Sequence, residues 1–154
     1  MKHLEVSDHF THLTQQVVRQ WQLENVRLNA GATEAELAAF EEHYDLALPA
    51  EFRHFYSVVN GMPDLEADQH FFSLWPLARM IEEYEGVLVE RSSLSQWIEI
   101  VFGDVLIDSY RYILAQIGEG QLFVKIQGDK EVLGNSFAHF WERYLSEPDK
   151  LHLM

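Results

Sequence analysis

Two aspartates in the second half of the chain have the spacing that most suggests chemistry. Asp104 and Asp108 bracket an apolar Val-Leu-Ile run, and Glu99 lies nearby in the sequence. If this run is a strand, a spacing of four places both carboxylates on one face, where they could hold a cation or act as acid and base. No lysine, histidine or activated nucleophile that would partner them is identifiable. The alternative is that Asp104 closes a turn after Gly103 and that Asp108 pairs with Arg111.

The histidines form a weaker pattern. His9 and His12 lie three apart on a predicted helix with Asp8 beside them, so a third ligand from elsewhere would complete a metal site. The alternative is that both point to solvent, opposite Phe10 and Leu13, and we predict no metal and no cofactor. The sequence contains no cysteine, and no Walker loop, G-x-G-x-x-G, G-x-S-x-G or H-E-x-x-H motif. We therefore predict a protein that is not an enzyme, with an enzyme that uses the two aspartates as an alternative.

Negative charge is the strongest compositional signal. The 154 residues include 25 acidic and 11 basic side chains, which gives a net charge of −14. Residues 33–51 hold six carboxylates and no lysine or arginine, and residues 62–90 hold seven carboxylates and one arginine. Such a surface repels nucleic acid and anionic membranes and attracts basic proteins. The alternative is that the charge only keeps the protein soluble.

This distribution defines two acidic patches. The 62–90 patch combines a polar loop with the helix predicted after it, and the two could present one continuous acidic surface to a protein partner. Its proposed contact residues are Asp64, Glu66, Asp68, Glu82, Glu83 and Glu85. The 33–51 patch is the rival location, through Glu34, Glu41, Glu42 and Asp45.

Hydrophobic periodicity indicates the elements that would position these side chains. We predict one domain over residues 1–154, made of an N-terminal helix and lead-in (1–30), a two-helix segment (31–61), strands (97–134) and a C-terminal helix (136–147). Helices come first, strands follow and one helix closes the chain. This order predicts an α+β fold with a mixed or antiparallel sheet covered by helices.

The part of the chain between these segments is less regular. Residues 71–75 form an apolar run that predicts a short strand. A helix is predicted from Pro76, because apolar residues recur at helical spacing as far as Leu88. Gly103 and Asp104 predict a turn between two strands.

Residues 31–61, GATEAELAAFEEHYDLALPAEFRHFYSVVNG, carry the most specific pattern. Thr33 and Glu36 form a capping box that starts the first helix, Pro49 suits the first turn of the second, and Gly61 can provide the left-handed cap that ends it. This segment resembles the entry segment of the SUKH (Smi/Knr-type) superfamily. Residues 98–114, with their Phe-Gly-Asp turn, and the Asn-Ser-Phe-Ala-His-Phe run at 135–140 are similar to later parts of the same domain.

The resemblance implies a function. Many bacterial members of this superfamily are immunity proteins that neutralise toxins, whereas fungal relatives act in cell-wall control through protein–protein contacts. A toxin that acts on nucleic acid has a basic cleft, which an acidic surface could occupy as a phosphate mimic. We therefore expect a protein that binds a basic toxin, with a regulatory scaffold as the alternative.

The cellular location follows from what the sequence does not contain. The N-terminus lacks the charged and apolar regions of a secretory signal, and no apolar run approaches the ~20 residues of a membrane-spanning helix. These features predict a cytoplasmic protein that contacts neither a membrane nor nucleic acid. The sequence does not indicate an oligomeric state.

Overall fold

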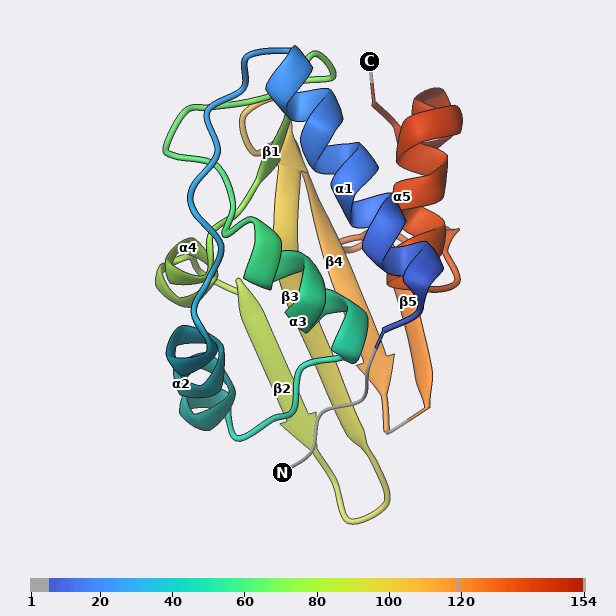
Figure 1. Cartoon of the computed structure of the whole chain (residues 1–154). Helices are drawn as coiled ribbons and strands as arrows, with labels where there is room; N and C mark the ends of the chain where they lie inside the picture. Colours follow the sequence, from blue (N-terminus) through green and yellow to red (C-terminus); the bar gives the residue numbers. More distant parts are fainter. Residues whose placement is uncertain (1–5, 119, 154) are drawn as a thin grey trace.

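The computed structural model describes residues 6–118 and 120–153, and these residues form the predicted α+β fold in a single domain (Figure 1). N-terminal helices precede a sheet, and a helix follows it. The elements in chain order are α1 (Asp8–Leu23), α2 (Glu34–Tyr44), α3 (Ala50–Val58), β1 (Phe72–Leu74), α4 (Leu77–Glu82), β2 (Val87–Arg91), β3 (Gln96–Val105), β4 (Tyr110–Ile117), β5 (Gln121–Ile126), β6 (Val132–Gly134), α5 (Phe137–Ser146) and the 3-10 helix η1 (Pro148–Leu151).

Strand β3 organises the sheet, in which every pair of strands is antiparallel. One edge of β3 pairs with β4, which leads to β5 and β6. Its other edge pairs with β2 along residues 96–100 and with β1 along residues 103–105, so these two short strands lie end to end. A bulge between Val101 and Gly103 separates the two stretches. A side chain at Gly103 would collide with the Phe72 ring, so the close approach of β1 requires glycine there.

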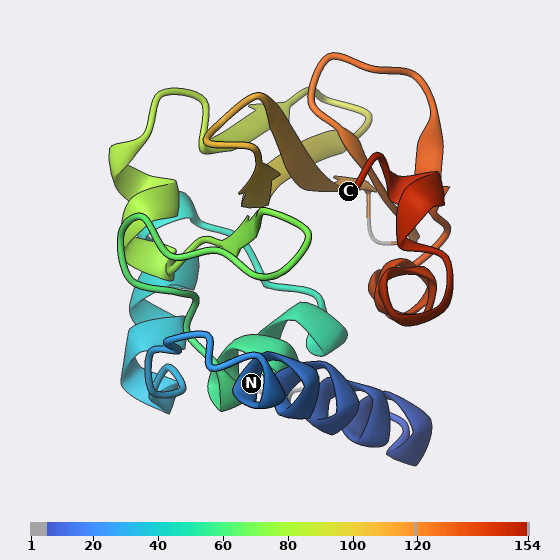
Figure 2. The same cartoon turned by 90° about the horizontal axis from the view of Figure 1, so that it is seen from above.

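Three helices cover one face of the sheet and enclose an aromatic core. Figures 1 and 2 show α1, α3 and α5 together on this face, while α2 and α4 lie toward the β2 side. The ring of Phe102 on β3 lies 5.3 Å from those of Phe137 and Phe140 on α5, and Phe55 on α3 stacks on Trp141 at 4.7 Å. All five side chains are buried, so the sheet and two helices share one continuous core.

Capping interactions start the helices where the sequence predicted. The Thr33 hydroxyl accepts a hydrogen bond from the Glu36 amide and the Glu36 carboxylate accepts one from the Thr33 amide, which confirms the capping box. Ser136 caps α5 by accepting from the His139 amide. The predicted role of Gly61 is wrong. Helix α3 ends at Val58, and Gly61 (φ 76°) instead passes so close to the Pro76 backbone that a side chain would collide.

The helix predicted from Pro76 to Leu88 is shorter than expected, and a strand, β2, replaces its second half. Helix α4 ends at Glu82, after which Glu85 takes a left-handed conformation (φ 56°) and the chain reverses into β2. Gly86 permits this reversal, because a side chain there would collide with the Met80 carbonyl. The apolar residues that predicted one continuous helix therefore belong to two elements, the first of them to α4 and Leu88 to β2.

The predicted turn at Gly103 and Asp104 is also wrong. Strand β3 continues through both residues to Val105, and the turn to β4 lies at residues 106–109. Asp104 therefore lies in a strand and Asp108 lies in the following turn. The two carboxylates therefore do not lie on one face of a strand, although the predicted cation or acid–base site required this arrangement.

The length and polarity of the helices bear on membrane insertion. Across residues 6–118 and 120–153, no helix is both long enough and apolar enough to cross a bilayer.

The core position of Phe52 on α3 leads to the first prediction. Its side chain is buried and its ring lies 4.6 Å from Tyr56 and 5.5 Å from Phe137. Phe52→Ala should lower the free energy of unfolding by roughly 3–5 kcal/mol, the usual cost for a buried phenylalanine. Urea melts measure this change, and Leu94→Ala at an exposed position is the control. A loss below about 1 kcal/mol for Phe52→Ala would show that the Phe52 side chain is not part of the core.

Candidate partner-binding site

A buried carboxylate fixes the loop between α3 and β1. Asp68 accepts hydrogen bonds from the Trp21 indole Nε1 at 3.0 Å and from the Tyr144 hydroxyl, which belong to α1 and α5. It also accepts from the amides of His70 at 2.7 Å and Phe72 at 3.0 Å. Burial raises the pKa of Asp68, although these hydrogen bonds oppose the rise. Asp68 is thus an internal anchor and does not contribute to the exposed acidic surface.

The first half of the same loop is tied to the segment after α1. The Glu66 carboxylate accepts hydrogen bonds from the Arg27 amide at 2.7 Å and from Arg27 Nε at 3.1 Å. The hydrogen bond from the Arg27 amide is the largest influence that lowers the pKa of Glu66. Asp64 and Leu65, just before it, are exposed. The loop is therefore held at both ends, with its acidic tip open to solvent.

A network of charges surrounds the Trp75 side chain next to this loop. Asp104 is buried and accepts a hydrogen bond from Trp75 Nε1 at 2.7 Å. The guanidinium groups of Arg79 and Arg111 lie 4.2 and 5.0 Å from the centre of the Trp75 ring. Arg79 also contacts Asp104 at 3.1 Å, so the ion pair and the stacking on Trp75 reinforce each other.

The network continues to the turn after β3. Arg111 donates to Asp108 at 2.7 Å, and its hydrogen bonds lower the pKa of Asp108. Glu83 lies 3.6 Å from both Arg79 and Arg111 and links the two ion pairs. This confirms the predicted pairing of Asp108 with Arg111. Each of the two aspartates considered for catalysis faces an arginine, an arrangement typical of a structural ion-pair network.

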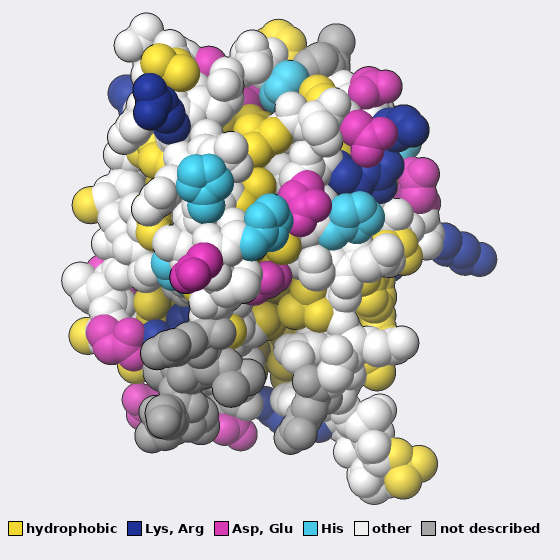
Figure 3. Space-filling model, turned by 45° about the vertical axis from the view of Figure 1, so that its right-hand side comes forward, with side chains coloured by type: hydrophobic (Ala, Val, Ile, Leu, Met, Phe, Trp, Pro, Cys, Tyr) yellow, Lys and Arg dark blue, Asp and Glu magenta, His cyan; other side chains and the backbone are white. Residues whose placement is uncertain are grey.

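Metal binding was the other chemistry considered. In the described part of the chain, no group of three or more His, Asp or Glu side chains is arranged to hold a metal ion. His9 and His12 are both exposed, and His9 lies 3.1 Å from Glu142 on α5. Figure 3 shows the side of the molecule that carries α1 and α5, where histidine, acidic and basic side chains are interspersed.

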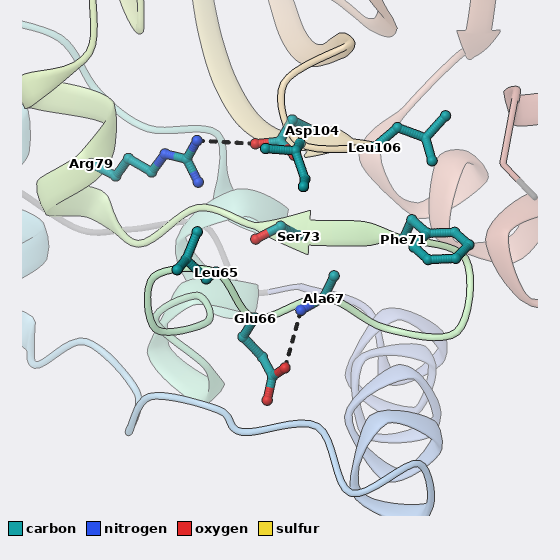
Figure 4. Close-up of a pocket in the computed structure, with 9 residues that line it drawn as sticks. Leu65, Glu66, Ala67, Phe71, Ser73, Arg79, Asp104 and Leu106 are labelled. Atoms are coloured by element: carbon teal, nitrogen blue, oxygen red, sulfur yellow. Dashed lines mark hydrogen bonds and ion pairs between the residues drawn. The ribbon is translucent and has the colours of Figure 1, made fainter.

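A cavity of about 560 Å³ opens between the 63–71 loop, β1, α4 and the turn after β3. Most of its lining side chains are apolar, and Figure 4 shows them around the Arg79–Asp104 ion pair. Three apolar residues at its rim are solvent-exposed: Leu65 at 92%, Ile107 at 89% and Phe71 at 52%. The residues that line the cavity are Leu65, Glu66, Ala67, Phe71, Ser73, Arg79, Asp104, Leu106 and Ile107.

Backbone strain gathers at this rim. Leu65, Phe71, Leu106 and Ile107 all have φ between 53° and 67°, the left-handed region that side chains other than glycine rarely adopt. Each such residue costs of order 1–3 kcal/mol, and such strain clusters at functional sites. Sequence reasoning missed the rim because its positive-φ positions carry leucine, isoleucine and phenylalanine, with no glycine to mark them.

The remaining residues of the 62–90 patch are more open. Glu82 and Glu85 are exposed, and neither forms an ion pair within the part of the chain that the structure describes. Glu82 is the last residue of α4, and Glu83 and Glu85 follow after the helix has ended. Glu82, Glu83 and Glu85 therefore do not share one helical face. The 62–90 patch therefore consists of the loop before β1, the end of α4 and the turn after α4. Within it, Glu83 forms ion pairs with Arg79 and Arg111.

The 33–51 patch is partly neutralised from within. Arg53 on α3 contacts Glu34 at 2.7 Å and Glu41 at 3.1 Å. Glu41 is mostly buried and also accepts a hydrogen bond from the Leu48 amide, so it holds the connection between α2 and α3. Glu42 and Asp45 remain exposed.

The titration of Asp68 leads to the second prediction. The pKa of Asp68 is higher in the folded protein than the value of about 3.9 in the unfolded chain. The contribution of Asp68 protonation to the free energy of unfolding is therefore present at low pH and is lost as the pH rises through the folded pKa. Asp68→Asn removes this titration. We expect the unfolding free energy of the parent, minus that of Asp68→Asn, to decrease from about pH 4 to about pH 7 in urea melts.

The exposed Asp64→Asn change, which removes a carboxylate from the surface of the same loop, is the matched control and is measured over the same pH range. A difference that grows with pH for Asp68→Asn would mean that hydrogen bonding to the carboxylate outweighs its burial.

Comparison with known proteins adds a family assignment to this geometry. The sequence profile of the SMI1 / KNR4 family (SUKH-1) matches residues 31–143, which extend from the lead-in to α2 into α5. None of the curated proteins compared with the chain matches it.

Proposed function

Because the chain belongs to the SMI1 / KNR4 family (SUKH-1), we propose that it is a protein-binding module that binds and neutralises a basic bacterial toxin, and that it acts without catalysis. The observation that carries this proposal is the group of carboxylates beside the apolar cavity. Asp64 adjoins the cavity rim, Glu66 lines it, and Glu83 contacts the arginine in its wall. An acidic surface with an apolar centre has the composition of a protein-recognition site for a basic partner.

Electrostatics supports the choice of a basic partner. The net charge of −14 creates a field that steers cations toward the protein. Glu82 and Glu85 lack arginine partners among the described residues, so their charge is available to an incoming protein. A toxin whose cleft binds nucleic acid would present lysine and arginine to this surface, and the carboxylates would take the place of phosphates.

The 62–90 patch is the better candidate of the two acidic patches. Arginines pair with carboxylates in both patches, but Asp64, Glu82 and Glu85 of the 62–90 patch are exposed and form no ion pair among the described residues. In the 33–51 patch, Arg53 pairs with Glu34 and Glu41, and Arg91 lies 3.9 Å from Asp45. The proposed contact residues are therefore Asp64, Glu66, Glu82, Glu83 and Glu85, and Asp68 supports them from inside.

The first test is biological protection. We expect an adjacent gene to encode the toxin domain; the chain is co-expressed with that domain, and cell survival is measured. Protection by the chain, with formation of a complex between the purified proteins, is the expected result. Cell death at equal toxin levels with and without the chain would overturn the proposal.

The third prediction concerns the rate of binding to that toxin domain. The association rate should fall by at least about tenfold between low and high salt, because salt screens exposed charges beyond roughly 8 Å at physiological ionic strength. Changing both Glu82 and Glu85 to Gln should lower the rate at low salt and leave stability within about 0.5 kcal/mol per change. Surface plasmon resonance measures the association rate.

The matched control replaces Glu42 by Gln and Asp45 by Asn, which removes the same charge from the 33–51 patch. Both residues are exposed. A larger rate defect in this control than in the 82/85 variant would move the contact to the 33–51 patch.

A further inference from the structure

Four apolar side chains with partly or largely exposed surfaces gather at the rim of the cavity. Leu65 and Phe71 come from the 63–71 loop, and Leu106 and Ile107 come from the turn after β3, so two segments of the chain contribute exposed apolar side chains to the opening. These four residues form what we call the apolar rim. A contiguous exposed apolar patch marks an interaction site more often than chance exposure does.

Hydrogen bonds hold the apolar rim in place. The Leu106 amide donates to the Phe71 carbonyl at 3.1 Å, which joins the turn after β3 to the loop before β1. The Phe71 amide donates to the Asp68 carbonyl at 3.0 Å, and the Asp108 amide donates to the Asp104 carboxylate at 3.3 Å. Phe71 and Leu106 are thus fixed by backbone hydrogen bonds, and the cavity exists before any partner arrives. A preformed apolar cavity lowers the entropic cost of binding.

The chemistry of the cavity suits large apolar side chains. Its walls are leucine, isoleucine, phenylalanine and alanine, and its polar groups are few: Ser73, the Glu66 carboxylate at the edge and the Arg79–Asp104 pair. The volume of about 560 Å³ exceeds that of one aromatic side chain, so two neighbouring side chains of a partner segment could enter together.

Charge around the opening decides between possible occupants. A second copy of this chain would bring another net charge of −14 toward the exposed Asp64 beside the rim, and repulsion would oppose the contact. A segment that carries lysine or arginine beside its apolar side chains would be attracted by Asp64 and by the net negative charge of the protein while its apolar groups fill the cavity. Side chains that are buried in a pocket of the partner and surrounded by contacts that exclude water are the usual form of an interface hot spot.

We infer that the cavity is a docking site for a basic, amphipathic segment of the partner protein, whose large apolar side chains enter between Leu65 and Ile107. This inference rests on the proposed function, in that it names the part of a basic partner that the site would recognise. The acidic surface speeds the encounter and the cavity slows dissociation. The two contributions can therefore be separated by experiment.

The experiment uses the full chain and two synthetic fluorescent peptides that have the same number of lysines. One peptide carries Leu and Phe at three- and four-residue spacing, and the other has Ser at those positions. Fluorescence anisotropy measures their Kd values at low and high salt. The parent protein should bind the Leu/Phe peptide at least about tenfold more tightly, the effect expected of a buried apolar anchor.

The test variant replaces both Leu65 and Ile107 by Asn, which tolerates the left-handed conformation and keeps the backbone while it removes the apolar rim. It should lose the preference for the Leu/Phe peptide and retain salt-sensitive binding of both peptides. The matched control is Leu94→Asn, since Leu94 is 95% exposed and lies in the β2–β3 connection away from the cavity. Methyl NMR of the parent gives an independent reading, with expected shifts at Leu65, Leu106 and Ile107 but not at Leu94.

The outcomes separate the two proposals. Equal affinity of the parent for both peptides, or a preference that persists in the Leu65/Ile107 variant, would overturn the docking site and leave the acidic surface as the proposed contact. A preference that is lost in the variant but does not depend on salt would support the docking site and contradict the electrostatic part of the proposed function. Failure of both peptides to bind at low salt would overturn both.

Discussion

The buried carboxylate of Asp68 is the interaction on which the rest of this structure depends. Its four donors come from α1, α5 and the backbone at the start of β1, so one side chain joins the first helix, the last helix and the sheet. An ionised carboxylate has the acceptor capacity for all four, and leaving buried donors without a partner would cost about 1–3 kcal/mol each. The fixed loop then positions Leu65, Glu66 and Phe71, so the geometry of the candidate site derives from a residue outside it.

Arginine placement decides which of the many carboxylates remain available on the surface. Arg53 crosses from α3 to the 33–51 patch, Arg27 binds the 63–71 loop, and Arg79 and Arg111 share Trp75 and the aspartates around it. Ion pairs that are partly buried and linked in networks stabilise more than isolated surface pairs. The net charge of a sequence segment therefore overstates the charge that a partner meets, and the difference depends on contacts between residues far apart in the chain.

Local signals in the sequence were sufficient for the fold class, for a closing helix after the strands and for several helix starts. Thr33 with Glu36, and Ser136, each cap a helix through neighbours within three residues, so their roles could be read directly. The end of α4 and the turn at residues 106–109 could not be predicted in this way. Glu85, Leu106 and Ile107 are left-handed there, although none of these residue types favours that conformation, and only the surrounding contacts hold them in it. The cavity could not be predicted for the same reason. Nothing in the sequence distinguishes Asp68 from its exposed acidic neighbours, because the partners that bury it, Trp21 and Tyr144, are distant in the chain.

The arrangement of β1 and β2 along one edge of β3 has an evolutionary consequence. The chain leaves the sheet after Leu74, forms α4 and returns at Val87, while the opposite edge of β3 remains paired with β4 throughout. Insertions or deletions in this excursion would leave the ladder between β3 and β4 intact, and lengthening a surface connection costs little free energy. The excursion carries Trp75, Leu77 and Met80, which are buried, and then an exposed end that includes Glu82 and Glu85. A lineage that keeps this sheet could therefore change the length and sequence of the exposed end, and with it the acidic surface, without redesigning its core.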